Sequence, residues 1–349
     1  MRRVLLTVHK FFPEHRAGTE VLTLKVAQEL QRRGTQVLVV TASPPDLDAR
    51  HAVGPPSSDY VYEGVDVHVV GESLRLKNYT FAHEYFHPEI KQHFAEVLDS
   101  FQPTLVHIFH AQNLSASIID ACEEKGVPVI CSTTDFWFVC PVVQLKRPDG
   151  ALCRGPDASA SNCLTCYTPE LIPPREQVQE AIVKKYPAAA GLLRAIPGFM
   201  KGTVASTLRT AYWSTKLPEA VSATRHRPAV LRQAANRTGA IMVPTMLMRD
   251  IFVENGIRED LLHHVPFGLD TALLVEHQKK TASPVIRFAF IGTIFEHKGL
   301  DLLIEAFQHL PPESAARLTI YGDLNQFPEY GRRMKELAER PLPNSAKIE

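Results

Sequence analysis

Short apolar runs alternate with amphipathic segments along the first third of the chain. Runs of this length, bounded by turns, are typical of strands buried in a parallel sheet. Strands are expected at residues 4–8, 37–40, 65–70, 105–108 and 127–132. Between them, apolar residues recur at helical spacing and predict helices over 19–33, 90–101 and 118–124. This alternation predicts an α/β fold built on a doubly wound, parallel, Rossmann-like sheet.

The alternation stops in the middle of the chain. Residues 141 to about 218 are rich in Pro, Gly, Ser and Cys and then become amphipathic and basic. We therefore expect an insertion over about 138–218, followed by a helix over 218–236 and a return to the sheet at 240–243. The insertion and the strands around it form an expected first domain over residues 1–270.

A second α/β unit follows a polar stretch at residues 271–284, which is interpreted as a linker. Two strands and two helices are expected in this unit, at 287–291, 302–310, 318–321 and 329–339. So few elements leave one sheet face and its edges uncovered. Residues 285–349 are therefore expected to be an incomplete domain.

Composition narrows the class of protein. The 349 residues suit two α/β domains, and 38 basic and 38 acidic side chains give a net charge of zero, which does not favour nucleic-acid binding. No apolar run approaches the length that spans a bilayer. The apolar run at 4–8 continues into His9 and Lys10, which indicates a strand and not a signal peptide. A cytoplasmic protein is expected.

Four of the six cysteines lie close together in the sequence, at Cys140, Cys153, Cys163 and Cys166. Four thiolates can bind zinc tetrahedrally, and the pair Cys163 and Cys166 has the Cys-x-x-Cys spacing of such sites. Reduced unliganded thiols or a redox pair would account for the same residues. Cys122 and Cys131 fall on apolar faces of predicted elements and are expected in the core.

The segment from Leu192 to Lys216 mixes apolar and aromatic residues with arginines and lysines. This composition suits a helix lying on an anionic membrane surface. It suits an ordinary amphipathic helix packing on the sheet equally well. A peripheral contact with the inner face of the membrane is therefore one of two open interpretations.

Candidate polar residues lie where elements meet. Gly18 stands between a strand and a helix N-terminus, where free N–H groups favour an anion, although a tight turn alone would explain a glycine. His110 lies just beyond a strand, at the end where α/β ligand sites form, whereas His107 is expected to be buried within that strand. Asp135 ends another strand and could hold a hydroxyl or cap a turn. Lys298, in a glycine-flanked loop, could neutralise a phosphate.

Several of these stretches, taken in order, resemble the retaining glycosyltransferases of family four, which have the two-domain GT-B architecture. The stretches that carry the resemblance are Phe12-Pro13 with Ala17-Gly18-Thr19-Glu20, Val106 to His110, Asp135-Phe136-Trp137 with Cys140-Pro141, Pro244-Thr245 with Phe267 to Asp270, and Phe290-Ile291-Gly292 through Lys298 to Asp301. Each is modest alone, and the resemblance runs from one end of the chain to the other.

The resemblance implies transfer of a sugar from a nucleotide diphosphate sugar to a glycan or lipid-linked acceptor, as in polysaccharide biosynthesis, with the anomeric configuration retained. It implies that Gly18 and Lys298 face the donor diphosphate and that His110 approaches the sugar. An alignment shifted by one would place Phe109 there. Thr293 stands where the family often has an arginine, so at least one phosphate contact differs. No catalytic metal is implied.

The family also carries a pair of spaced glutamates later in its donor domain, and those positions would lie beyond Glu349. The chain as given is therefore expected to be a fragment that binds nucleotide sugar weakly or not at all and has no transferase activity. A non-catalytic module that binds a glycan acceptor remains an alternative. Another Rossmann enzyme, such as a nucleotide-sugar epimerase, is disfavoured because no G-x-G-x-x-G turn follows the first strand.

Overall fold

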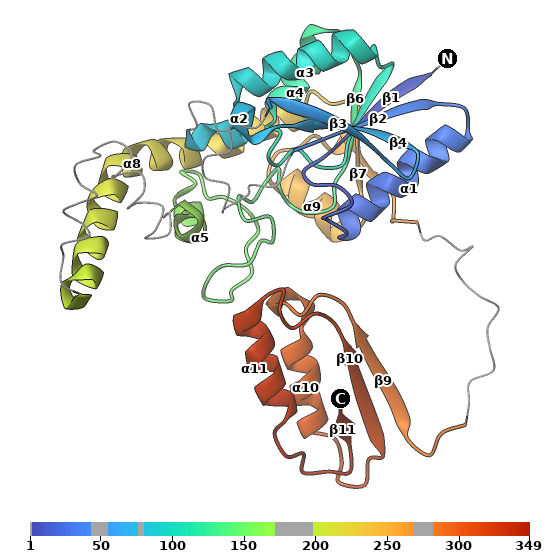
Figure 1. Ribbon diagram of the computed structural model, residues 1–349, viewed down its shortest axis with the longest axis vertical. Helices are drawn as coiled ribbons and strands as arrows, with labels where there is room; N and C mark the ends of the chain where they lie inside the picture. Colours follow the sequence, from blue (N-terminus) through green and yellow to red (C-terminus); the bar gives the residue numbers. More distant parts are fainter. Residues whose placement is uncertain (1, 43–54, 76–79, 172–197, 269–281) are drawn as a thin grey trace. The chain divides into compact units, whose positions relative to one another are not determined.

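The computed structural model describes residues 2–42, 55–75, 80–171, 198–268 and 282–349. The chain forms two compact units, residues 1–268 and residues 269–349. Each unit has its own apolar core. Each unit also has its own sheet, and the sequence colouring of Figure 1 distinguishes the two.

Unit 1 contains an eight-stranded sheet with the order β3-β4-β2-β1-β5-β6-β7-β8. Every pairing is parallel except the hairpin of β3 with β4, which confirms the predicted α/β class. The strands are β1 (Arg3–Val8), β2 (Gln36–Ala42), β3 (Ser57–Tyr62), β4 (Val65–Val70), β5 (Leu105–Ile108), β6 (Val129–Ser132), β7 (Ala240–Val243) and β8 (Leu262–His264). Because β2 and β5 flank β1, the strand order reverses beside β1, and ligands of such sheets bind at this switch point.

Helices cover both faces of this sheet, because successive side chains of a strand point to opposite faces. Val4 and Leu6 of β1 pack in one cluster with Leu24, whereas Leu5 belongs to the other cluster with Phe94. The helices are α1 (Gly18–Arg32), α2 (Glu72–Arg75), η1 (Phe81–Glu84), α3 (Pro88–Phe101), α4 (Ser117–Glu124), α5 (Ser161–Leu171), α8 (Gly198–Ala235), α9 (Met246–Glu254) and η2 (Glu259–Leu261). Figure 1 shows α1 and α3 on opposite sides of the strands.

The register of the central strands aligns their carboxyl ends. Thr7 pairs with both Val40 and Ile108, and Ile108 pairs with Cys131. The residues that follow β1, β5 and β6 therefore emerge side by side at one edge of the sheet.

The main departure from the prediction is α8. This helix begins at Gly198 rather than near residue 218, and it contains both Pro218 and Pro228. A proline removes only its own backbone bond and strains one turn, so a long helix can continue through it. The predicted membrane-surface segment lies in part outside the described residues, at 192–197. None of the helices in the described part of the chain has both the length and the apolar character needed to cross a bilayer.

Unit 2 contains a parallel three-stranded sheet with the order β11-β10-β9. Its elements are β9 (Ile286–Ile291), η4 (Glu296–Lys298), α10 (Leu300–Gln308), β10 (Ala316–Tyr321), α11 (Pro328–Ala338) and β11 (Lys347–Ile348). Strand β11 was not predicted, because two residues give no periodicity. The core joins Ile304 and Met334 to Leu318. On edge strand β9, Ile286 and Ile291 are 67% and 81% exposed.

Candidate functional site

A histidine and a carboxylate meet at the carboxyl edge of the unit 1 sheet. His110 lies two residues after β5, and its Nε2 atom is 2.8 Å from Oδ2 of Asp135, three residues after β6. The backbone N–H of Gln112 donates to Nδ1 of His110 at 3.0 Å, so Nδ1 must be the acceptor. The proton of the ring therefore lies on Nε2 and is donated to Asp135.

Asp135 is the partner that faces outward. Its side chain is 28% exposed, whereas that of His110 is 2% exposed. Oδ1 of Asp135 accepts a hydrogen bond from the Trp137 backbone N–H at 2.9 Å. Burial raises the pKa of this carboxyl, but its interactions with His110 and with the N–H of Trp137 outweigh burial, so the pKa lies below its usual range. Asp135 is therefore a preoriented carboxylate.

This arrangement gives His110 and Asp135 different roles. His110, predicted to approach a sugar, has both ring nitrogens engaged and a buried side chain. It can orient Asp135, while Asp135 can reach a ligand. His110, Asp135 and Trp137 line one small pocket. Phe109, the residue of the shifted alignment, packs in the core cluster that includes Leu24 of α1.

His9 and Glu20 extend this cluster, and the sequence interpretation missed both. The ring of His9, directly after β1, lies 4.4 Å from that of His110, and its Nε2 is 3.6 Å from Oε1 of Glu20. Burial, and then the proximity of His110, lowers the pKa of His9 to about 3, so His9 is neutral near pH 7 and its contact with Glu20 is not an ion pair. The sequence could have identified His9 as a site residue, because it follows a parallel strand as His110 does.

Gly18 opens α1 beside this cluster. It is exposed, and no heavy atom lies within 4 Å of the place a Cβ would take. The first N–H groups of a helix have no partner within it, and Ala17 offers no side-chain cap, so an anion can approach. The hydroxyl of Thr19 is 2.9 Å from that of Thr134, which ties the start of α1 to the residue before Asp135.

Trp137, whose N–H bonds to Asp135, is also held through its carbonyl by Arg227 of α8. The guanidinium donates to the Trp137 carbonyl at 2.7 Å and makes two hydrogen bonds to the carboxylate of Glu84, at 2.9 and 3.1 Å. Both the Arg227 and the Glu84 side chain are buried, at 2% and 11% exposed. Nothing in the local sequence pattern indicates this contact, because it joins residues 90 positions apart.

His107 has a structural role, as predicted. It is buried in β5, and its Nε2 is 2.9 Å from the hydroxyl of Ser132 in β6. Burial lowers the pKa of His107 to about 4. Cys122 and Cys131 are likewise buried in the core, where burial raises the pKa of each thiol to about 12.

The donor-side candidates lie in unit 2. Thr293 and Lys298 belong to the connection between β9 and α10, with Lys298 exposed at the end of η4. Gly299 takes φ +67°, a left-handed conformation that glycine adopts at little cost, and α10 follows at once. The structure thus puts Lys298 directly before a helix N-terminus, as the sequence predicted.

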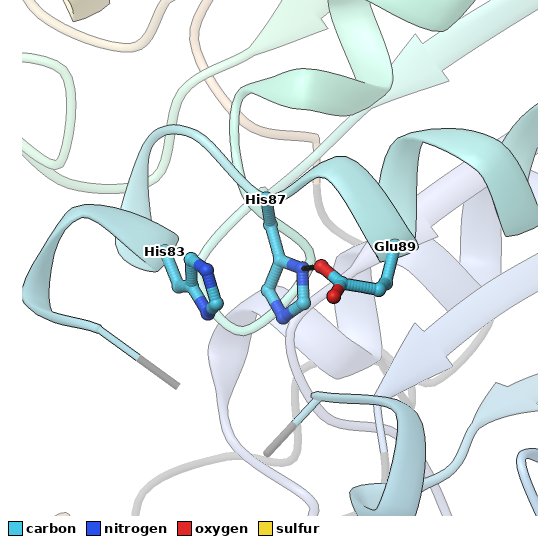
Figure 2. A group of neighbouring side chains, drawn as sticks. All are labelled: His83, His87 and Glu89. Carbon is cyan, nitrogen blue, oxygen red and sulfur yellow. Dashed lines mark ion pairs between the residues drawn. The ribbon is translucent and has the colours of Figure 1, made fainter. Parts of the chain in front are cut away.

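Figure 2 shows a separate group formed by His83, His87 and Glu89. Among the described residues, only this group brings three possible ligand atoms within 4.8 Å of one another. His87 is the N-cap of α3: Nε2 faces the carbonyl of Arg75 at 2.9 Å, and Nδ1 lies 3.4 Å from the N–H of Ile90 and 3.3 Å from Glu89. With its proton on Nε2, His87 donates to the Arg75 carbonyl and accepts from the Ile90 N–H at Nδ1, so both nitrogens are engaged and this group is a helix cap rather than a metal site.

Comparison with known proteins bears on the fold. Two crystal structures of Alr3699/HepE from Anabaena, one with UDP and one with UDP and glucose, superpose with TM-scores of 0.52 and 0.51 at 14% and 13% identity. Both comparisons cover 100% of this chain, and 68% and 69% of the Anabaena chain. No curated protein matches the sequence.

The fold therefore defines the class: the chain has the GT-B fold of glycosyltransferases. Residues 16–198, more than half of the chain, match the family described as Glycosyltransferase Family 4. The chain belongs to that family.

Proposed function

We propose that this protein transfers a sugar from a nucleotide diphosphate sugar to a glycan or lipid-linked acceptor with retention of configuration. The observation that carries the proposal is the Asp135 carboxylate. It is charged, partly exposed, and fixed by His110 and Trp137 beside the switch point of the sheet. A group held this rigidly can position a reacting hydroxyl.

In this proposal Asp135 accepts a hydrogen bond from a neighbouring hydroxyl of the acceptor and so aims the reacting hydroxyl at the anomeric carbon. In a retaining transfer the hydroxyl attacks the face from which the diphosphate leaves, and a departing phosphate oxygen takes its proton. The start of α1 at Gly18 supports a contact with the diphosphate, as does Lys298 in unit 2. His110 acts as a positioning residue through Asp135.

The first donor to test is a UDP-sugar, because the Anabaena protein was crystallised with UDP and with UDP-glucose. A lipid-linked acceptor would bring the protein to the inner face of the membrane. The basic segment from Leu192 to Lys216 is the proposed contact there.

The test is a transfer assay on the protein as its gene encodes it, with UDP-, ADP- and GDP-sugars and a panel of glycan acceptors. Asp135→Asn is expected to lower kcat by roughly a hundredfold or more, with little change in donor affinity, because it removes the charge that orients the hydroxyl. The matched control is Asp66→Asn, an exposed aspartate on β4, which should leave kcat unchanged.

Full activity of Asp135→Asn would remove Asp135 from the mechanism. Glycan binding that depends on Asp135, without transfer from any donor, would instead identify a non-catalytic acceptor-binding module.

A further inference from the structure

The four clustered cysteines of the sequence come from three local structures of unit 1. Cys140 follows the turn after Asp135, and its N–H donates to the carbonyl of Phe136 at 2.7 Å. Cys153 ends a small hairpin in which Lys146 pairs with Leu152. Cys163 and Cys166 lie at the start of α5, three positions apart and so on one helix face.

These three structures converge on one place. All four cysteines line a single small pocket together with Lys146 and Asn162. None of the four forms a disulfide. Two are buried and two are half-buried, so the cluster is largely withdrawn from solvent.

Polar groups surround the sulfur of Cys153. Its Sγ lies 3.2 Å from the carbonyl of Gly155, to which a thiol can donate, and 3.4 Å and 3.9 Å from the Gly155 N–H and the side-chain amide of Asn162, which can donate to a thiolate. Gly155 takes φ +128°, a conformation that side chains rarely adopt, which lets the chain turn back toward the sulfur. Cys163 lies in the first turn of α5, and burial raises the pKa of its thiol to about 12, so its sulfur loses the proton only when a metal cation binds it.

The helix start is also fixed independently of the sulfurs. The carboxylate of Asp157 accepts from the N–H groups of Ser159, Ser161 and Asn162 at 2.9–3.1 Å. The two cysteines of α5 are thus held in place before any ligand binds. Lys146, which lines the pocket, adds positive charge beside a site that would carry net negative charge with four thiolates.

From this convergence we propose that Cys140, Cys153, Cys163 and Cys166 bind one structural zinc ion. Their sulfurs are not gathered as tightly as the ligand atoms of the His83 group. Zinc bonds of about 2.3 Å therefore require the sulfurs to move together, and a change of χ1 rotamer moves a sulfur by about 3 Å. Four sulfur ligands leave no open position, so the role is structural: the ion joins the Asp135 turn, the hairpin and α5.

The experiment measures metal content of the full chain, purified without chelator, by mass spectrometry. About one zinc ion per chain is expected. Cys166→Ala, which changes a half-buried ligand, should reduce zinc to below about a tenth of that value. The matched control is Cys122→Ala, a buried core thiol outside the cluster, which should retain the metal.

A second measurement keeps the test decisive should a variant fail to fold. In the unmodified protein, titration with an organomercurial should release zinc to a colorimetric chelator as thiols of the cluster react. Protein free of zinc that takes up none on reconstitution would overturn the proposal. So would a disulfide within the cluster on peptide mapping, or bound iron in place of zinc.

Discussion

The buried histidines beside the sheet are held neutral by the protein interior. His9 and His107 have pKa values lowered to about 3 and about 4, in both cases chiefly by burial. In the unfolded chain each would titrate near 6.5. Below that pH the unfolded state gains protons that the folded state excludes, so stability falls as the pH falls toward the folded pKa.

For His107 this reasoning gives a testable magnitude. When the pH is lowered from about 7.5 to about 4.5, protonation of His107 in the unfolded chain should lower the unfolding free energy by about 2–3 kcal/mol. His107→Gln, which keeps a polar partner for Ser132, should therefore lose less stability over this range than the unmodified protein. Urea unfolding at both pH values measures the difference, and equal losses in the two proteins would contradict it.

For single residues, the sequence predicted where the site residues lie better than what each of them does. His110 and Asp135 could be found because both follow parallel strands, and that rule also covered His9. Which of the pair reaches solvent could not be predicted. It depends on the Gln112 and Trp137 N–H groups and on packing between segments 25 positions apart.

At the scale of elements, α8 is joined to the site through one buried ion pair. Arg227 bonds both to Glu84 of η1 and to the carbonyl of Trp137, two residues after Asp135. Removing one partner of a buried pair leaves the other charge without compensation.

Arg227→Ala is therefore expected to lower the unfolding free energy by about 3 kcal/mol or more. Arg225→Ala, an exposed arginine of the same helix, should change it by less than about 0.5 kcal/mol. Urea denaturation of both variants checks the prediction. Equal stability of the two would show that the buried pair contributes nothing net.

Helix α8 also shows where periodicity fails as a guide. Its start could not be predicted because Pro218 usually marks a boundary, and here the helix continues through it. The strands of the sheet were easier to predict, because a short apolar run beside a turn in an α/β chain is nearly always a buried strand.

At the scale of the whole molecule, the two units have separate cores. The clusters around Leu5 and Leu6 lie within unit 1, and that around Ile304 lies within unit 2. Unit 2 is small, and its edge strand β9 leaves apolar side chains exposed. A small unit buries a smaller share of its surface and gains less from folding.

Residues 1–268 expressed alone are accordingly expected to fold and to unfold at the same urea midpoint as in the whole chain. The whole chain should show an additional transition at lower urea, from unit 2. Circular dichroism and tryptophan fluorescence can follow this, since Trp137 reports on unit 1 only. A shifted midpoint for residues 1–268 would show that the units stabilise each other.

The contact between Arg227 and Trp137 has a consequence for how such proteins can vary in length. It joins the two ends of the long insertion between β6 and β7. One end is the turn after Asp135, and the other is α8. Lengthening a loop whose ends are fixed costs little free energy. The stretch between these anchors can therefore change in length at little cost in stability while the Asp135 carboxylate keeps its place.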